Sequence, residues 1–276
     1  MAKSCEAVQE LEELGFNTVW IPEAVGREPF AHAGILLSAT KKLIVGTGIA
    51  SMYARTASTM QAGQKTLTSA FPDRFLLGIG ASHGNMVKSL HKTAYVKPYS
   101  TMVEYLDVMD GGMFMAAAPT TPLHRVLAAL GPKMLKLAGE RADGAHPYFT
   151  TPKHTAVARE ILGSGPTLAP EQAVILETDP TKARAIARAF VASVSKMTAC
   201  SGASVGLLPK ISRATAVCFG VVKYGCAPSA RSPANFNIFG PRAANTRCNG
   251  VVGSAATNIP LSITSRYSTI AEYGFT

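Results

Sequence analysis

Residues Leu43 to Asn85, LIVGTGIASMYARTASTMQAGQKTLTSAFPDRFLLGIGASHGN, decide the fold because they read as strand, helix and strand. The run LIVGTGIAS is apolar and β-branched without alternation, which predicts a strand buried on both faces. Residues 56–70 have apolar positions at helical spacing, and Pro72 and Asp73 end that helix before a second buried strand, RFLLGIG. We therefore predict a βαβ unit with two parallel strands.

Both predicted strands end in small or polar residues. The first ends at 48–51 (Gly-Ile-Ala-Ser) and the second at 81–85 (Ala-Ser-His-Gly-Asn). In barrels built from βαβ units, chemistry is carried by residues at the carboxyl ends of the strands. These two ends are the first place to expect a functional site.

The same stretch resembles the luciferase-like flavin and deazaflavin oxidoreductases, a family of (β/α)8 barrels. The resemblance is carried by GTGI at 46–49, FPDRFLLGIG at 71–80 and the Ser-His-Gly that follows, with weaker similarity from Cys5 to Ala192. Within the family the chain is most similar to actinobacterial members that use the deazaflavin coenzyme F-420. The resemblance implies hydride transfer between this 8-hydroxy-5-deazaflavin and a small organic substrate; the alternative is an FMN-dependent monooxygenase.

The resemblance also implies which residues bind the coenzyme. Gly48 and Ile49 correspond to a position where the family often has a non-prolyl cis peptide behind the coenzyme ring, although an ordinary strand glycine is the simpler interpretation. Hydrogen bonds to the ring are expected from Ser51, Ser82 and Asn85. Gly131 opens a Gly-Pro helix whose free N–H groups would hold the phosphate, and His146 would lie beside the coenzyme.

Two residues are candidates for proton transfer. His83 follows a strand end, and its unperturbed pKa lies near neutrality. Glu23 ends the predicted strand at 17–23, where a carboxylate either serves catalysis or caps the next helix. Tyr53 and Arg55 are candidates for contact with the substrate or with the acidic tail of the coenzyme, although the family often has Asp-Pro where this chain has Thr-Ala at 56–57.

The rest of the front portion supplies further strands and helices, but the barrel looks incomplete. Later strands are predicted at 125–130, 143–148 and 171–177, separated by helices. Only four residues precede the first predicted helix, at 5–14, so the first strand of the family's barrel is missing. We predict an α/β fold: an incomplete (β/α)8 TIM-type barrel over residues 1–194.

Residues 195–276 have a different character. They contain eight Lys or Arg residues, a single acid (Glu272) and four of the five cysteines, and no helical period lasts beyond a turn or two. This composition is typical of translation in a shifted reading frame of GC-rich DNA; a divergent C-terminal domain is the alternative. The best strand composition in this tail is at 215–222. A catalytically inactive truncated barrel is therefore a further alternative for the whole chain.

Composition excludes several classes of function. The chain has 276 residues and a formal charge of +10, but its basic residues are scattered singly, which argues against nucleic-acid binding. The cysteine spacings match no zinc pattern, so no metal site is predicted. No apolar run is long enough to cross a membrane, and no secretory signal is seen. We expect a cytoplasmic enzyme with a small-molecule substrate, and a homodimer as its candidate assembly.

Overall fold

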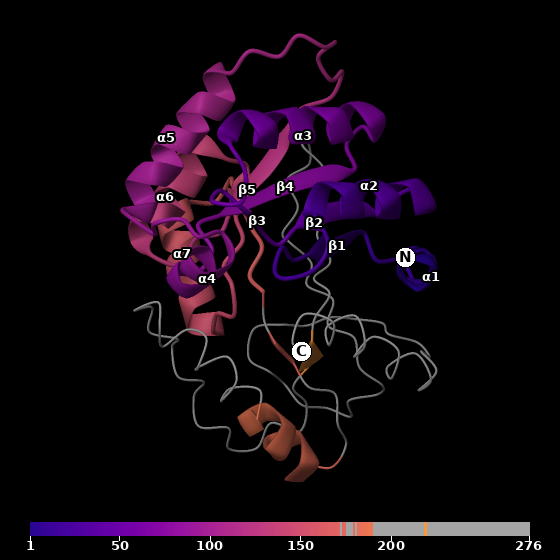
Figure 1. Ribbon diagram of the computed structural model, residues 1–276. Helices are drawn as coiled ribbons and strands as arrows, with labels where there is room; N and C mark the ends of the chain where they lie inside the picture. Colours follow the sequence, from indigo (N-terminus) through magenta and orange to yellow (C-terminus); the bar gives the residue numbers. More distant parts are fainter. Residues whose placement is uncertain (172, 175–178, 180, 190–217, 220–276) are drawn as a thin grey trace.

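The computed structural model describes residues 1–171, 173, 174, 179, 181–189, 218 and 219. Its main sheet is parallel throughout, with the order β1-β2-β4-β5-β6-β7 and with β3 paired to β4 (Figure 1). This sheet confirms the predicted α/β class and the βαβ unit at 43–85. Its strands are β1 (Thr18–Ile21), β2 (Ile44–Thr47), β3 (Ala50–Ser51), β4 (Phe75–Gly80), β5 (His124–Leu127), β6 (Gly144–Ala145) and β7 (Thr167–Leu168).

Helices connect successive strands and lie around the outside of the sheet (Figure 1). In the described residues no helix is long and apolar enough to cross a membrane. These helices are α1 (Ala2–Glu13), α2 (Pro29–Ala39), α3 (Ala57–Ala70), α4 (Gly84–Leu90), α5 (Pro98–Gly111), α6 (Pro132–Arg141) and α7 (Pro152–Leu162). Residues 181–189 are also helical.

The sheet curls until its distant strands meet across the interior. Trp20 on β1 and His146, directly after β6, are separated by three strands in the sheet order. Their rings nevertheless stack, with centroids 4.2 Å apart and planes within 8° of parallel. Inward-pointing side chains fill the middle of such barrels, so this stack marks the barrel interior.

Glycines in β2 and β4 allow the close packing at the centre of the sheet. Trp20 lies opposite Gly46 in register, and a Cβ on Gly46 would stand 2.7 Å from the Trp20 ring. A Cβ on Gly78 would meet the carbonyl oxygen of Thr47 at 1.9 Å. The Thr47 hydroxyl in turn donates to the Gly78 carbonyl (2.8 Å) and accepts from the Gly78 N–H (2.9 Å), which ties β2 to β4.

The last strand of the main sheet differs from the prediction. The sequence suggested a strand at 171–177, but β7 at 167–168 is the strand that pairs with β6. Most of 171–177 lies outside the described residues. Its described strand, β8 (Ala173–Val174), pairs antiparallel with β9 (Cys218–Phe219). The strand β9 lies within 215–222, the stretch with the best strand composition in the tail. The rest of the proposed tail, 195–276, lies outside the described residues.

Candidate functional site at the carboxyl ends of the strands

The break between β2 and β3 lies at the carboxyl edge of the sheet. The peptide bond between Gly48 and Ile49 is cis, as the family resemblance implied. Beyond it, β3 rejoins the sheet beside the end of β4, where the Met52 N–H donates to the Gly80 carbonyl at 3.0 Å. Gly48 also lies close to the interior stack, because a Cβ there would stand 3.1 Å from His146 Nε2.

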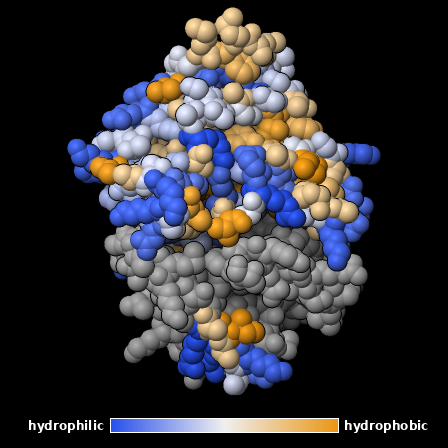
Figure 2. Space-filling view, in the orientation of Figure 1, coloured by the Kyte–Doolittle hydropathy of each residue, from blue (hydrophilic) through white to orange (hydrophobic). Residues whose placement is uncertain are grey.

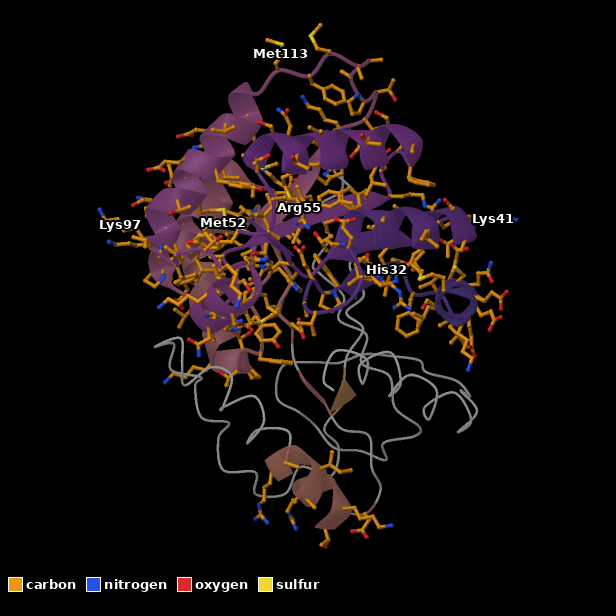
Figure 3. The ribbon with its side chains drawn as sticks, viewed as in Figure 1. His32, Lys41, Met52, Arg55, Lys97 and Met113 are labelled. Atoms are coloured by element: carbon orange, nitrogen blue, oxygen red, sulfur yellow. The ribbon has the colours of Figure 1, made fainter. Side chains whose placement is uncertain are left out.

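Glu23 and Arg55 bind each other at this edge. Arg55 Nη1 donates to Glu23 Oε2 at 2.9 Å, and Arg55 Nη2 donates to Glu23 Oε1. The Ser51 N–H donates to the same carboxylate at 2.7 Å, and both side chains are about nine-tenths buried. Arg55 lies near the middle of the molecule in Figure 3, with its guanidinium 5.2 Å from the centre of the Phe30 ring.

This ion pair changes what can be expected of both residues. Glu23 does not cap α2, because Glu28 does so by accepting from the Ala31 N–H at 2.6 Å. A bidentate contact between guanidinium and carboxylate fixes both groups geometrically. In this structure Glu23 and Arg55 therefore hold the β3 segment in place, and the catalytic and substrate roles expected of them remain predictions.

Two tyrosines adjoin the mouth of the barrel beside β3 and β4. The rings of Tyr53 and Tyr95 lie 5.5 Å apart, and the Tyr95 hydroxyl donates to the Ser82 carbonyl at 3.5 Å. Ser82 has a positive φ of 55°, an uncommon conformation for a residue other than glycine. The Ser51 hydroxyl accepts from the Tyr53 N–H at 3.2 Å, so Ser51 is buried within this turn.

His83 is the N-cap residue of α4 and faces a second aromatic group. Its ring meets the edge of Tyr148 at a centroid distance of 6.0 Å, and Tyr148 contacts Phe149 at 4.1 Å. Burial lowers the pKa of His83 below its ordinary value, which keeps the imidazole neutral at neutral pH. Asn85 is exposed in the first turn of α4.

His146 is a deeply buried polar group at this end of the barrel, with 3% of its surface exposed. Its Nδ1 lies 2.7 Å from the Ala169 carbonyl, which can only accept, so Nδ1 carries the proton. Nε2 is then a buried acceptor, without a hydrogen-bond partner among the described residues. Desolvation lowers the pKa of His146 to about 4, so the ring is neutral.

Trp20 and Glu171 complete this side of the mouth, and the sequence analysis identified neither. The indole Nε1–H of Trp20 is a buried donor without a partner in the described part of the chain. Glu171 Oε2 lies 3.8 Å from His146 Nε2, and burial raises the pKa of Glu171 to about 7. Trp20 could have been found because it is the single tryptophan and lies in a predicted strand. The position of Glu171 could not, because it depends on the register of β7.

Gly131 precedes α6 at the carboxyl end of β5. It is the N-cap residue of that helix, has no side-chain cap, and would leave open space around an added Cβ. Uncapped N–H groups at a helix N-terminus attract anions.

The methionines of the loop after α5 lie away from the site. Met113 and Met115 are 84% and 88% exposed, so they do not line it (Figure 3). Figure 2 shows the mildly hydrophobic surface at the end of the molecule that carries this loop.

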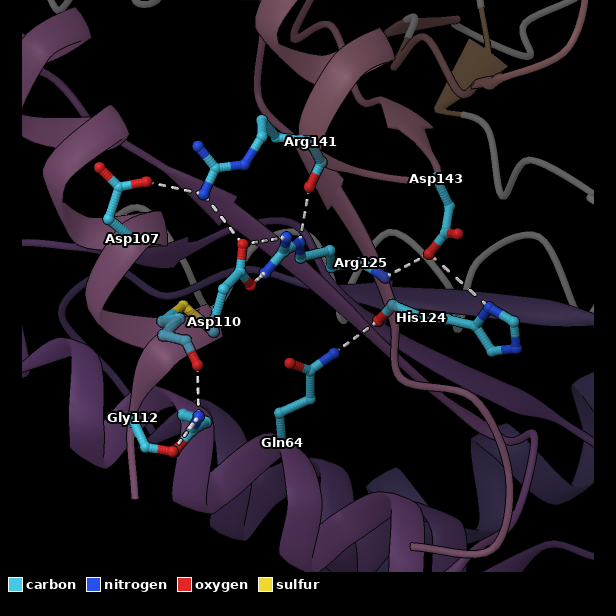
Figure 4. Close-up of polar contacts among 10 residues, drawn as sticks. Gln64, Asp107, Asp110, Gly112, His124, Arg125, Arg141 and Asp143 are labelled. Carbon is cyan, nitrogen blue, oxygen red and sulfur yellow. Dashed lines mark hydrogen bonds and ion pairs between the residues drawn. The ribbon is translucent and has the colours of Figure 1, made fainter. Parts of the chain in front are cut away.

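A cavity of about 480 Å³ lies at the opposite end of the barrel, where β5 and β6 begin. Its charged residues bind one another (Figure 4): Arg125 donates to Asp110 at 2.6 Å, and Arg141 donates to Asp107 and Asp110 at 2.9 Å each. Asp143 accepts from the Arg125 N–H at 2.8 Å. Across the described chain, no group of three or more His, Cys, Asp or Glu side chains could hold a metal ion.

Residues 2–213 match the family model of luciferase-like monooxygenases. The chain belongs to this family. It is 28% identical over 190 residues to a putative coenzyme F-420-dependent oxidoreductase of Mycobacterium tuberculosis, covering 58% of this chain and 55% of the relative. It is 26% identical over 212 residues to 5,10-methylenetetrahydromethanopterin reductase of Methanolobus tindarius, covering 66% and 64%. The chain thus spans a little over half to two-thirds of the length of these relatives.

Solved structures of other proteins share the fold. An F-420-dependent secondary alcohol dehydrogenase, solved with an F-420–acetone adduct, aligns with a TM-score of 0.60 and 20% identity over 76% of this chain and 75% of that one. The FMN-bound oxygenating constituent of 3,6-diketocamphane monooxygenase from Pseudomonas putida aligns with a TM-score of 0.54 and 14% identity, covering 72% and 71%. Members of this fold thus include both deazaflavin and FMN proteins.

Proposed function

We propose that the protein is an oxidoreductase that transfers hydride between the deazaflavin coenzyme F-420 and a small organic substrate at the carboxyl ends of its strands. The observation that carries this proposal is the mouth itself. There the neutral His83 and the buried ring nitrogens of Trp20 and His146 lie at the carboxyl ends of the strands, in a chain whose curated relatives include a putative F-420-dependent oxidoreductase.

The residues at the mouth fit a flat, anionic coenzyme. A bound ring system with acceptors on its edge would satisfy the Trp20 N–H, which is costly to bury without a partner. The uncapped N-terminus of α6 at Gly131 would hold a phosphate. Ser82, after β4, and Asn85, in the first turn of α4, are expected to contact the ring, whereas the Ser51 N–H and hydroxyl already bind protein groups.

A bound deazaflavin would supply the hydride chemistry. This chain's residues would position the substrate and move its proton. His83 is our candidate acid or base, because its imidazole is neutral near pH 7 and lies at the mouth beside Tyr148. The Glu23–Arg55 pair would keep the β3 turn rigid, so that the substrate meets a fixed surface.

Calorimetric titration of the full chain with F-420 and with FMN tests the coenzyme directly. We expect tighter binding of F-420; tighter binding of FMN would overturn the proposal in favour of a flavin monooxygenase. A matched pair of variants tests the phosphate position. Both Gly131→Asp and Gly131→Asn can cap α6, but only the carboxylate repels an anion. Asp should therefore weaken coenzyme binding at least about tenfold more than Asn, as expected for a charge placed against a phosphate.

A further inference from the structure

We propose that Glu171 and His146 form a pair that holds one exchangeable proton at the mouth of the barrel and serves as the proton reservoir of the reaction. This inference rests on the proposed hydride transfer. When hydride leaves a carbon that bears a hydroxyl group, the C–H bond breaks with its electron pair, and the hydroxyl proton must pass to a base. In the reverse direction the carbonyl oxygen must receive a proton. His83 would exchange that proton with the substrate, and the pair, with Glu171 ionised, would take it up and return it.

The orientation of the imidazole is fixed on two sides. Its plane is held by the stack on Trp20, at 4.2 Å and 8°, and its Nδ1–H donates to the Ala169 carbonyl at 2.7 Å. The tautomer is thereby set, and Nε2 must present its lone pair. No described residue donates to that lone pair.

Glu171 is placed to supply the missing proton. It follows β7, and its N–H donates to the Pro147 carbonyl at 2.7 Å, which holds it alongside the residue after His146. Its Oε2 is 3.8 Å from Nε2, and 31% of its side chain is exposed at the mouth. At this distance a protonated carboxyl reaches the lone pair after a small side-chain rotation or through one bridging water.

The surroundings favour a neutral pair. Burial raises the pKa of Glu171 to about 7, while burial lowers the pKa of His146 to about 4. Burial raises the pKa of Tyr148, and a charge on Glu171 raises it further, so the phenol stays protonated. The His83 ring meets that phenol ring in an edge contact. Near neutral pH the shared proton therefore belongs to the carboxyl group, with the imidazole as its acceptor.

Nuclear magnetic resonance of the full chain, labelled with ¹³C-Glu and ¹⁵N-His and titrated from pH 5 to 8.5, tests this pair. We expect one carboxyl resonance to titrate near pH 7, and the His146 Nε2 resonance to shift with the same midpoint while keeping the position of an unprotonated nitrogen. Both changes should vanish in Glu171→Gln and persist in Glu160→Gln, the same substitution on an exposed residue of α7.

The experiment separates this inference from the proposed function because it needs no coenzyme. Titration of Glu171 below pH 5, or a protonated Nε2 in the neutral ring, would overturn the pair even if F-420 binds. Failure of F-420 to bind, with the shared titration near pH 7 present, would overturn the proposed function and support the pair.

Discussion

At the amino-terminal end of the strands, Arg125 binds Asp110 and the Arg141 carbonyl, and Asp143 receives the Arg125 N–H. At the carboxyl end, the ring nitrogens Nε1 of Trp20 and Nε2 of His146 are buried without partners in the described part of the chain. Both ends are built on the same strands and both are rich in polar groups. The Arg125 network satisfies its charged atoms within the protein, whereas the two ring nitrogens have no described partner, and under our proposal a ligand would approach them.

The largest effect should come from disturbing the sheet that both ends share. Gly78→Ala places a Cβ 1.9 Å from the Thr47 carbonyl oxygen, so β2 and β4 must separate. We expect about 4 kcal/mol or more of lost stability, the range of severe backbone and packing defects. Urea unfolding measures it. Gly111→Ala, where an added Cβ meets nothing within 4 Å, is the control and should leave the unfolding midpoint nearly unchanged; equal stabilities of the two variants would contradict the β2–β4 packing.

The second effect is a pH dependence of stability that comes from His146 at the carboxyl end. The pKa of His146 falls from 6.5 to about 4 on folding. As the pH drops from 6.5 towards 4, His146 therefore binds a proton in the unfolded chain but not in the folded chain. His146 alone should lower stability by roughly 3 kcal/mol through this window, since one pKa unit is worth about 1.4 kcal/mol. Glu171, with its pKa raised to about 7, binds a proton on folding and contributes in the opposite direction. Unfolding measured at pH 6.5 and 4.5 in the parent protein and in His146→Phe, which can still stack on Trp20, isolates the His146 contribution, and the variant should lose less stability than the parent. An equal loss in that variant would assign the acid sensitivity to other groups.

The third prediction concerns turnover at the carboxyl end, where His83 lies. His83→Ala should lower turnover by about a hundredfold while leaving coenzyme affinity within a few-fold, as expected for a lost general acid or base. The measurement is the rate of deazaflavin reduction, with the compound that reacts fastest in a screen of small organic substrates. His91→Ala, at the C-terminal end of α4, is the control. Unchanged turnover in His83→Ala would leave His83 with a structural role only.

The amino-terminal network should matter for stability alone. Arg125→Met removes the guanidinium contacts with Asp110 and with the Arg141 carbonyl. The cost should be about 1–2 kcal/mol, because the network is partly exposed. Coenzyme affinity, measured by calorimetry, should stay within twofold. A large loss of affinity would show that the two ends are coupled.

The smallest expected effect lies at the carboxyl end. Trp20→Phe keeps a ring beside His146 but removes the unpaired indole N–H. We expect coenzyme affinity to fall a few-fold, with stability unchanged or slightly raised, because a buried donor without a partner is unfavourable. An affinity equal to that of the parent protein would show that the indole N–H does not meet the ligand.

The sequence allowed the central βαβ unit to be predicted because continuous apolar runs and the Pro72–Asp73 break are local signals. It also placed His83 and the Gly48–Ile49 peptide bond at the strand ends. The strand β7 was missed because two residues give no periodicity. Glu171 was missed as a site residue because its approach to His146 depends on how β7 aligns with β6. Likewise, the mutual binding of Glu23 and Arg55 joins residues 32 apart, and no sequence spacing reveals it.

The stack of Trp20 on His146 has a practical consequence. The chain contains one tryptophan, and its indole lies in the barrel interior against a histidine. Its ultraviolet emission therefore reports on this single location, free of contributions from other indoles. Protonation of the adjacent imidazole would quench that emission, and a nearby coloured coenzyme would receive its excitation energy. The protein thus carries an intrinsic optical probe at the point where we place its chemistry.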